Sequence, residues 1–513
     1  MAYNLLTEKV VPIEAKEGTL WVTLPGAFAM MSSGAADGFA MVRPHQRHGL
    51  HMFAVQVAAM ASEELSPSEI FSDNEDVWKQ RLLKLAPEGW ELVQDDCGKP
   101  GFLQPPMDAV SFKKAIEKKG NHVLTADDMT VLVRSRNHVV KFSRMTESLP
   151  WHWVCSLVEI QTLSGFEGRG LYGTARMYGG FGSRFMVGTY DDLCPSAMWK
   201  RDVRRALALL KGVERDYPFY GEAGTKHGLL WILPWDGESR LELGQLHPLF
   251  IDVSRRIRLF STSDGNIAST YIISSCPRIN SGEQNGRLGD PWAPINVKNN
   301  SSLGAKTIDV KLLRNLIIAD GQGDYQQAPL QTIDSKDNGD LYFHLAAVIG
   351  GQGKTEGFHE KTIHIPGAIR DMAFGGGLGS KRLGDCANAM LNDADKAWSC
   401  LRKAVFAATQ ASRDEIDWKH PQSEAAAGKA RGLFKEEYED NYFPYLWSAM
   451  SDEGGDDWIS FLRAACDRVL ESILVGYGPK TQFVYKARAK ATGMLSGSWN
   501  KEFKTEERNE RHN

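Results

Sequence analysis

Glycines, arginines and aromatic residues gather between residues 165 and 188, the segment best suited to contact another molecule. Eight of its 24 residues are glycine, a density that no helix tolerates. Glycine exposes backbone N–H groups and permits close approach to a backbone or a base edge. The interleaved side chains are Arg169, Arg176, Arg184, Phe166, Tyr172, Tyr178 and Phe181. Basic residues mixed with aromatic residues suit nucleic acid. A glycine-rich hairpin packed inside a large α/β domain is the alternative that these residues leave open.

A second glycine-rich segment, GGQGKTEG at residues 350–357, looks at first like a phosphate-binding loop. The phosphate-loop pattern needs glycine at the position of Val348, and the sequence that follows, TEGFHEKTIHIPG, is not an apolar helix. We therefore predict no nucleotide hydrolysis at this segment. A turn presenting Lys354, Thr355 and Glu356 remains, which either joins two strands or inserts into another molecule.

His359, Glu360 and His364 resemble the ligand set of a zinc protease, but their spacing is wrong. Two histidines on one helical face must be four residues apart, and these are five apart. Thr362, Ile363 and the nearby Pro366 favour a strand instead, so we predict structural histidines. The sequence offers no Ser/His/Asp, Cys/His or paired-carboxylate set either. We expect no enzyme activity, no catalytic residue, no bound metal and no cofactor.

Composition and charge indicate an ordinary globular protein with one unusual stretch. The 513 residues carry 60 Lys and Arg against 64 Asp and Glu, so the net charge of −4 does not by itself indicate nucleic acid. Residues 131–190, however, hold seven basic and three acidic residues, and a polyanion site should be sought there. Seven scattered cysteines without a C-x-x-C pair predict reduced thiols. With neither a secretory signal nor an apolar run of membrane-spanning length, we expect a soluble, cytoplasmic protein.

Hydrophobic periodicity predicts an α+β protein of two parts. Predicted strands, helices and turns alternate over residues 1–375, which indicates a large mixed α/β domain. Four helical segments of similar length with short connections follow over residues 384–513, and they predict an antiparallel four-helix bundle. A run of three glycines precedes this change, so we expect a linker at residues 376–383. One face of the third helix is predicted to carry Trp458, Leu462, Ala465, Val469 and Ile473.

Taken in order, these segments resemble the CasA family, the large subunit of the type I-E CRISPR surveillance complex called Cascade. The opening NLLTEKVVPI is similar to the family's N-terminal strand, and SRNHVVK at residues 135–141 to a loop before its core region. SGFEGRGLYGTARMYGGFGSR at residues 164–184 resembles the family's glycine loop, and GGQGKTEG at residues 350–357 its wedge hairpin. The family also ends in a four-helix bundle, so the resemblance extends over essentially the whole chain.

This resemblance implies a non-catalytic subunit of an RNA-guided antiviral complex. Guide RNA would read the target, and this subunit would read a short protospacer-adjacent motif in double-stranded DNA. The family approaches the motif from the minor groove, whose degenerate code fits tolerance of several motifs. A wedge then parts the first base pair, at a cost of roughly a few kcal/mol, to start R-loop formation. The implied partners are guide RNA, several other Cascade subunits, target DNA, and a helicase–nuclease or a nuclease domain on a sister subunit.

Carried over by position, the resemblance assigns three groups of residues. Gly165, Phe166 and Gly168 match the glycine loop, and Arg169 and Arg287 are added to them as predicted DNA-motif contacts. The wedge residues are Gln352, Gly353, Lys354, Thr355 and Glu356, where some members carry an amide pair at the tip. The contacts with neighbouring subunits and the RNA 5′ end are Asn137, His138 and Lys141. The family's basic finger has no clear match, and its candidates are Arg278, Arg287 and Lys298. A cysteine cluster carried by some members is missing, so no zinc site is expected.

Two other classes of function remain open on the sequence. A nucleotide- or metal-dependent enzyme could use the glycine-rich loops, and its isolated chain would bind a metal ion or a nucleotide. A scaffold subunit could dock partners through the bundle without touching DNA, and changes at residues 165–168 would then not alter any motif dependence.

Overall fold

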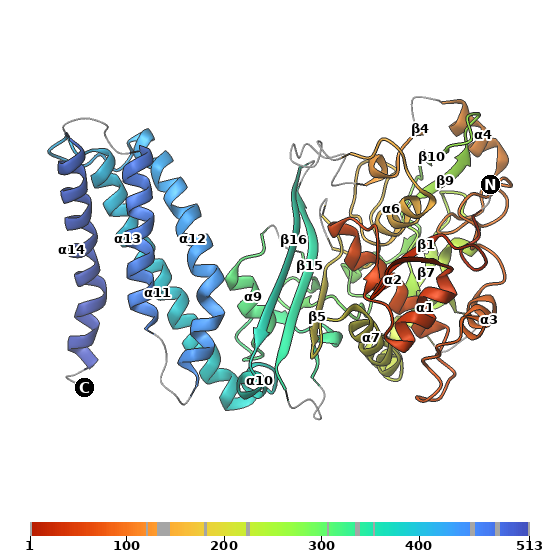
Figure 1. Ribbon diagram of the computed structural model, residues 1–513, viewed down its shortest axis with the longest axis horizontal. Coiled ribbons are helices and arrows are strands. Elements are labelled where there is room, and N and C mark those ends of the chain that lie inside the picture. Colours follow the sequence, from red (N-terminus) through yellow and green to blue (C-terminus); the bar gives the residue numbers. More distant parts are fainter. Residues whose placement is uncertain are drawn as a thin grey trace. The chain divides into compact units, whose positions relative to one another are not determined.

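The computed structural model describes residues 3–118, 122–130, 144–178, 182–221, 226–304, 307–333, 339–351, 354–451, 457–477 and 483–510. The chain divides into two compact units (Figure 1). The first comprises Met1–Ile308 with Asp324–His364, and the second comprises Asp309–Gly323 with Ile365–Asn513. Among the described residues, no helix is both long and apolar enough to cross a membrane.

The first unit mixes helices with several small sheets, as the sequence predicts. Its helices are α1 (Leu24–Ser33), α2 (Pro44–Met60), α3 (Glu75–Leu85), α4 (Ala109–Glu117), α6 (Pro150–Thr162), α7 (Pro195–Leu210) and α8 (Val213–Asp216). Its first strands are β1 (Val11–Ala15), β2 (Gly18–Val22), β3 (Gly38–Phe39), β4 (His122–Val123), β5 (Met186–Tyr190), β6 (His227–Leu229), β7 (Leu241–Glu242) and β8 (Leu246–Ile251). The strands that follow are β9 (Arg256–Ser261), β10 (Ile267–Ile272), β11 (Ile279–Asn280), β12 (Ile295–Asn296), β13 (Ser301–Ser302), β14 (Tyr325–Gln326), β15 (Leu341–Gly351) and β16 (Lys354–Ile365).

These strands form separate sheets of two or three strands. The three-stranded sheets have the orders β2-β1-β3, β4-β10-β9, β13-β12-β14 and β16-β15-β5, and the pairs are β11-β7 and β6-β8. The long β15 pairs antiparallel with β5, with Tyr342 opposite Tyr190 and Ala346 opposite Met186. β15 and β16 are the arms of the hairpin that carries the 350–357 segment.

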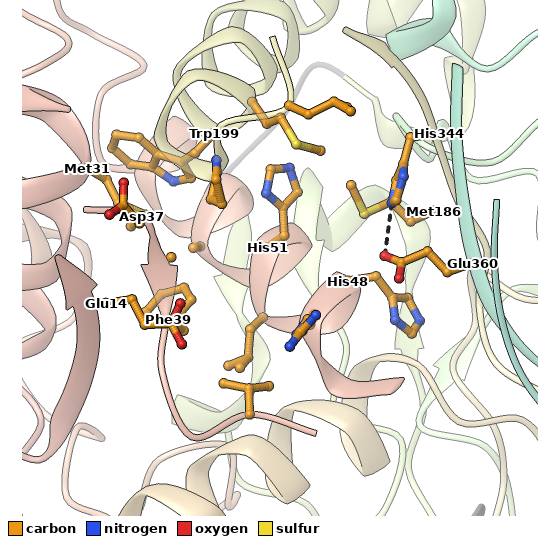
Figure 2. A pocket seen from close by; sticks show the side chains of 18 of the residues that line it. Glu14, Met31, Asp37, Phe39, His48, His51, Met186, Trp199, His344 and Glu360 are labelled. Atoms are coloured by element: carbon orange, nitrogen blue, oxygen red, sulfur yellow. Dashed lines mark ion pairs between the residues drawn. The ribbon is translucent and has the colours of Figure 1, made fainter. Parts of the chain in front are cut away.

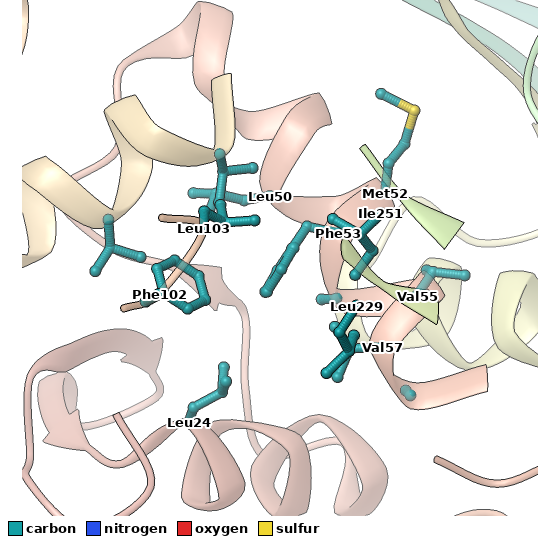
Figure 3. Close-up of a cluster of buried hydrophobic side chains, with 14 of the residues drawn as sticks. Leu24, Leu50, Met52, Phe53, Val55, Val57, Phe102, Leu103, Leu229 and Ile251 are labelled. Atoms are coloured by element: carbon teal, nitrogen blue, oxygen red, sulfur yellow. The ribbon is translucent and has the colours of Figure 1, made fainter. Parts of the chain in front are cut away.

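Helix α2 is the centre of the hydrophobic core of the first unit. It begins with a proline at its first position, where no hydrogen-bond donor is needed, and most of its residues are buried. It packs against α6, α7 and β8, which explains why it is buried on nearly every face. Figure 3 shows Leu50, Phe53 and Val57 of α2 among buried side chains from other segments, such as Phe102 and Ile251.

The second unit contains the predicted helix bundle. Its helices are α9 (Val310–Ile317), α10 (Gly367–Phe374), α11 (Gly377–Thr409), α12 (Pro421–Ala449), α13 (Trp458–Tyr477) and α14 (Val484–Glu510). Helix α11 packs against α12, α13 and α14, and successive long helices run antiparallel (Figure 1). The predicted apolar face of α13 is buried, as shown by Trp458, Leu462, Ala465, Val469 and Ile473. The α+β class with a C-terminal bundle is therefore confirmed.

The structure places the boundary between the parts differently from the sequence prediction. Residues 377–383, predicted as part of a linker, are the first turns of α11. The glycine run makes only the short break before that helix, because Gly375 ends α10 and Gly376 has a positive φ of 69°. The second unit also begins earlier, at Ile365, and takes in residues 309–323. That second segment lies far from the bundle in sequence, so local composition did not reveal it.

Candidate nucleic-acid interface

The glycine loop, residues 164–184, leaves the end of α6 and is pinned at its base by backbone hydrogen bonds. Helix α6 is buried over most of its length and ends at Thr162. Ser164 then forms a bridge with Ser183, and the Gly165 N–H donates to the Gly182 carbonyl over 3.0 Å. The Thr174 N–H donates to the Ser164 carbonyl over 3.1 Å. The two ends of the loop are thus held together over the core.

The tip of the loop is a tight turn built on glycines in the left-handed region. The Leu171 N–H donates to the Gly168 carbonyl over 3.0 Å, and the Glu167 N–H donates to the Leu171 carbonyl over 3.1 Å. Gly168 has a φ of 137° and Gly170 a φ of 82°, values that side chains rarely allow. A Cβ atom on Gly168 would meet nothing within 4 Å. Gly168 therefore presents bare backbone to the outside.

A buried arginine fixes the loop from below. The guanidinium of Arg255 donates from Nη2 to the Gly165 carbonyl over 2.6 Å and lies 3.0 Å from Glu167 Oε1. It also donates to the Ile160 carbonyl near the end of α6. The Arg255 side chain is fully buried, so this ion pair is shielded from solvent. Sequence reasoning missed this contact, since the partners are about 90 residues apart and carry no local signal.

The outer face of the loop carries one arginine and exposed aromatic rings. Arg169 is exposed and makes no side-chain hydrogen bond or ion pair with the described residues. Phe166 is 43% exposed and Tyr178 is 44% exposed, so both aromatic rings are open to solvent. Phe166 lies 6.2 Å from Tyr172, centroid to centroid. Exposed aromatic rings can stack on bases, and the exposed guanidinium beside them can pair with phosphate.

Two of the arginines that suggested nucleic acid are structural. Arg176 is 1% exposed and donates to the carbonyls of Leu288, Pro248 and Phe250. Arg184 is 2% exposed and forms a two-point ion pair with Asp290. For these two arginines the packed alternative that the sequence left open is therefore correct. They stabilise the core beneath the loop, and Arg169 alone of the three lies at the surface.

A cleft of about 370 Å³ opens beside the loop, lined by Gly165, Phe166, Tyr178, Arg278 and Gly286 among others.

The three candidates for the basic finger differ in their surroundings. Arg278 is 2% exposed, donates to the Leu233 carbonyl over 2.7 Å, and its burial lowers the pKa of its guanidinium to about 9. It therefore stays charged at neutral pH. Arg287 is partly exposed next to the cleft residue Gly286, and Lys298 pairs with Asp324 over 2.6 Å.

The predicted wedge segment lies on the hairpin of β15 and β16, and β15 is hydrogen-bonded to the glycine loop. The Ser183 N–H donates to the Val348 carbonyl over 2.8 Å, and the Val348 N–H donates to Ser183 Oγ over 2.7 Å. Lys354, Thr355 and Glu356 belong to β16. Gln352 and Gly353 lie outside the described residues, as do the side chains of Lys354–Glu356. Asn137, His138 and Lys141 lie outside them too.

The histidines at 359–364 stand on a strand, as predicted from their spacing. β16 covers Lys354–Ile365, and His364 Nε2 lies 2.8 Å from Asp340 Oδ2. No cluster of three or more His, Cys, Asp or Glu side chains suited to a metal ion occurs in the part of the chain that the structure describes. The strand β16 begins at Lys354, which agrees with rejecting a phosphate loop, since that motif leads into a helix.

No protein-family model matches the sequence, and no curated protein is significantly similar to it. Solved structures match over nearly the whole length. A CasA crystal structure from Thermus thermophilus superposes with a TM-score of 0.66 at 11% identity, over 98% of this chain and 100% of that chain. Cse1 of Acidimicrobium ferrooxidans gives a TM-score of 0.63 at 15% identity, over 98% and 99% of the two chains. Cse1 of Thermobifida fusca gives 0.60 at 14%, over 98% of each chain.

These structures define the class to which the fold belongs, an α/β body followed by a helix bundle. The chain has the CasA fold, and the resemblance deduced from the sequence is confirmed at the level of structure. At 11–15% identity the likeness establishes the fold, and the functional residues must be argued from this chain's own contacts.

We expect Gly173→Ala to distort the glycine loop. A Cβ atom at Gly173 would lie 2.7 Å from the Gly165 carbonyl carbon and 2.9 Å from the Phe166 nitrogen. Because these neighbours are backbone, the loop itself must move, at a cost of about 1–3 kcal/mol. Chemical unfolding and hydrogen exchange at residues 164–174 measure the effect. Gly244→Ala is the control, since its nearest atom would be 3.6 Å away. Equal stability of the two variants would contradict the close packing.

Proposed function

We propose that this protein is the non-catalytic large subunit of an RNA-guided type I-E CRISPR complex and reads a protospacer-adjacent motif in double-stranded DNA. The observation that carries the proposal is the open backbone at Gly168 beside the exposed Arg169, in a chain with the CasA fold. One of the similar structures is of Cse1, described as a CRISPR-associated protein. Guide RNA would read the remaining target sequence.

The geometry of the glycine loop suits a minor groove. That groove is about 6 Å wide, so a turn without side chains enters it where a bulkier turn would collide. Gly168 supplies the bare backbone, and Arg169 supplies charge for the narrow groove, whose potential is negative. The neighbouring Arg287, partly exposed beside the cleft, is the better placed of the basic-finger candidates. Buried Arg278 is less free to reach DNA, and Lys298 is exposed but pairs with Asp324.

Motif reading and strand opening would be performed by neighbouring parts of the first unit. The hydrogen bonds between Ser183 and Val348 join the glycine loop to β15. The wedge residues Gln352–Glu356 follow β15 directly, so contact at the loop would bring the hairpin to the same duplex. Inserting a turn between base pairs needs a rigid support, since unstacking costs roughly a few kcal/mol. The antiparallel pairing of β5 with β15 provides it.

The remaining contacts of the proposed subunit are with protein and RNA. Asn137, His138 and Lys141 would face sister subunits and the RNA 5′ end, within residues 131–190, which hold seven basic and three acidic residues. The protein would help to recruit or position a nuclease, either a separate helicase–nuclease or a domain on another subunit. None of these roles requires a catalytic residue in this chain.

Gly168→Asp is expected to abolish the preference for motif-bearing DNA. The substitution adds a carboxylate where open backbone meets the groove, and it leaves the buried anchor Arg255 untouched. Gel-shift titrations of the assembled complex on motif-bearing and motif-free duplexes measure the effect. We expect a loss of at least about tenfold on the motif-bearing duplex. Co-purification of guide RNA and sister subunits with a tagged copy should be unchanged.

Gly265→Asp is the matched control for this experiment. Gly265 also has a positive φ, 83°, and a Cβ atom added there would meet nothing within 4 Å. The aspartate at this position therefore adds the same charge and a similar backbone strain outside the glycine loop. The control should bind like the parent. A parallel loss in both variants, or an equal loss of the Gly168→Asp variant on both duplexes, would indicate general electrostatics and contradict motif reading by the loop.

Replacing Lys354, Thr355 and Glu356 together by alanine is expected to slow strand opening more than motif binding. The wedge acts after the motif is bound, at the first base pair. A fluorescent base analogue beside the motif reports opening, and a duplex already mismatched at that position serves as control. Mismatched DNA should restore the rate of the variant. If it does not, the hairpin tip is a structural turn and the wedge assignment fails.

A further inference from the structure

A cavity of about 380 Å³ in the first unit, separate from the glycine loop, has no role in the function proposed above. It lies between α2, the start of α7, the β1 and β3 strands and the hairpin of β15 and β16 (Figure 2). This volume falls within the ~300–1,000 Å³ of small-molecule pockets. Its apolar walls include Met31, Phe39, Leu50, Met186, Met198 and Trp199.

Carboxylates stand on two opposite sides of this cavity. Glu14 and Asp37 lie on the side of Trp199, and Glu360 lies on the far side beside the histidines (Figure 2). The side chains of Glu14 and Asp37 make no hydrogen bond or ion pair with the described residues. Arg47 contributes one positive charge to the lining, so negative charge is in excess and an anionic ligand is disfavoured.

A buried histidine at the far side has unused hydrogen-bonding capacity. His48 is 3% exposed, and neither ring nitrogen has a hydrogen-bond partner among the described residues. Its ring stacks on Phe358 with centroids 5.8 Å apart, which fixes its orientation. Burial lowers the pKa of His48 to about 3, so the ring is neutral and one nitrogen is a hydrogen-bond acceptor. Buried polar atoms normally have partners, which indicates that a donor belongs here.

The neighbouring histidines leave this acceptor role to His48. His51 Nε2 lies 2.9 Å from Asp202 Oδ2, so that nitrogen is already engaged. His344 Nδ1 lies 3.1 Å from Thr362 Oγ1, and its Nε2 lies 3.7 Å from Glu360 Oε1. Burial lowers the pKa of His344 to about 4. At neutral pH Glu360 therefore faces an uncharged His344.

We propose that this cavity binds a linear aliphatic amine with an ammonium group at each end, of the diamine or polyamine class. One ammonium would lie against Glu14 and Asp37. The methylene chain would run along the apolar wall, where Trp199 and Phe39 offer aromatic surface that also favours cations. The second ammonium would donate to Glu360 and to His48. The ligand thus supplies donors to the carboxylates and the histidine at the two ends of an apolar passage.

The test is isothermal titration of the full chain with spermidine and, separately, with butylamine. We expect one saturable site for spermidine and binding weaker by about tenfold or more for butylamine, which has a single ammonium. Glu360→Gln, at a half-exposed position, should lower the spermidine affinity by about fivefold. The double variant Glu14→Gln/Asp37→Asn, at two exposed positions, should lower it by about fivefold to tenfold.

The matched control is Glu17→Gln/Asp73→Asn, which removes two exposed carboxylates outside the cavity lining. This control should bind spermidine like the parent. Equal weakening of the control and the cavity variants would mean diffuse attraction to the surface and would overturn the proposal. Equal affinity for butylamine and spermidine, or no saturable spermidine binding, would overturn it as well.

Discussion

The glycine loop depends on one buried charge, the guanidinium of Arg255. Helix α6 ends with carbonyl groups that lack partners within the helix, and Arg255 donates to one of them, that of Ile160. The same guanidinium holds the Gly165 carbonyl and pairs with Glu167. Removing it would break the ion pair with the nearly buried Glu167 carboxylate, and removing one partner of a buried pair typically costs about 3–5 kcal/mol. The open backbone at Gly168 is therefore supported by a polar contact in the core.

The first unit uses the same arrangement repeatedly. Arg258 is fully buried and donates to the backbone carbonyls of Lys99, Gln94 and Asp96, while its burial lowers the pKa of its guanidinium to about 10. Arg176 likewise donates to carbonyls of strand β8 and lies over the Phe250 ring. An arginine has five donors in a planar fork, so one residue can satisfy several irregular segments at once. This is how a body with many short strands keeps its interior hydrogen-bonded.

The sequence predicted elements whose signal is local, and it failed where contacts are distant. The helices of the bundle and the apolar face of α13 follow from three- and four-residue spacing. The strand at His359 and His364 follows from β-branched neighbours. Charge counting over residues 131–190 was misleading, because Arg176 and Arg184 find partners in Pro248 and Asp290. The segment 309–323, which joins the second unit, carries no local sign of that attachment.

Strand β15 relates the glycine loop to the cavity of the first unit. Val348 is hydrogen-bonded to Ser183 of the loop, and His344, four residues earlier, lines the cavity. Residues four apart in a strand are separated by about 13 Å and face the same side of the sheet. Pairing with β5, which contributes Met186 to the cavity wall, fixes this spacing. The two sites thus share one framework but differ in charge. The loop exposes Arg169, and the cavity exposes Glu14 and Asp37, so a polyanion and an amine would each be drawn to a different place.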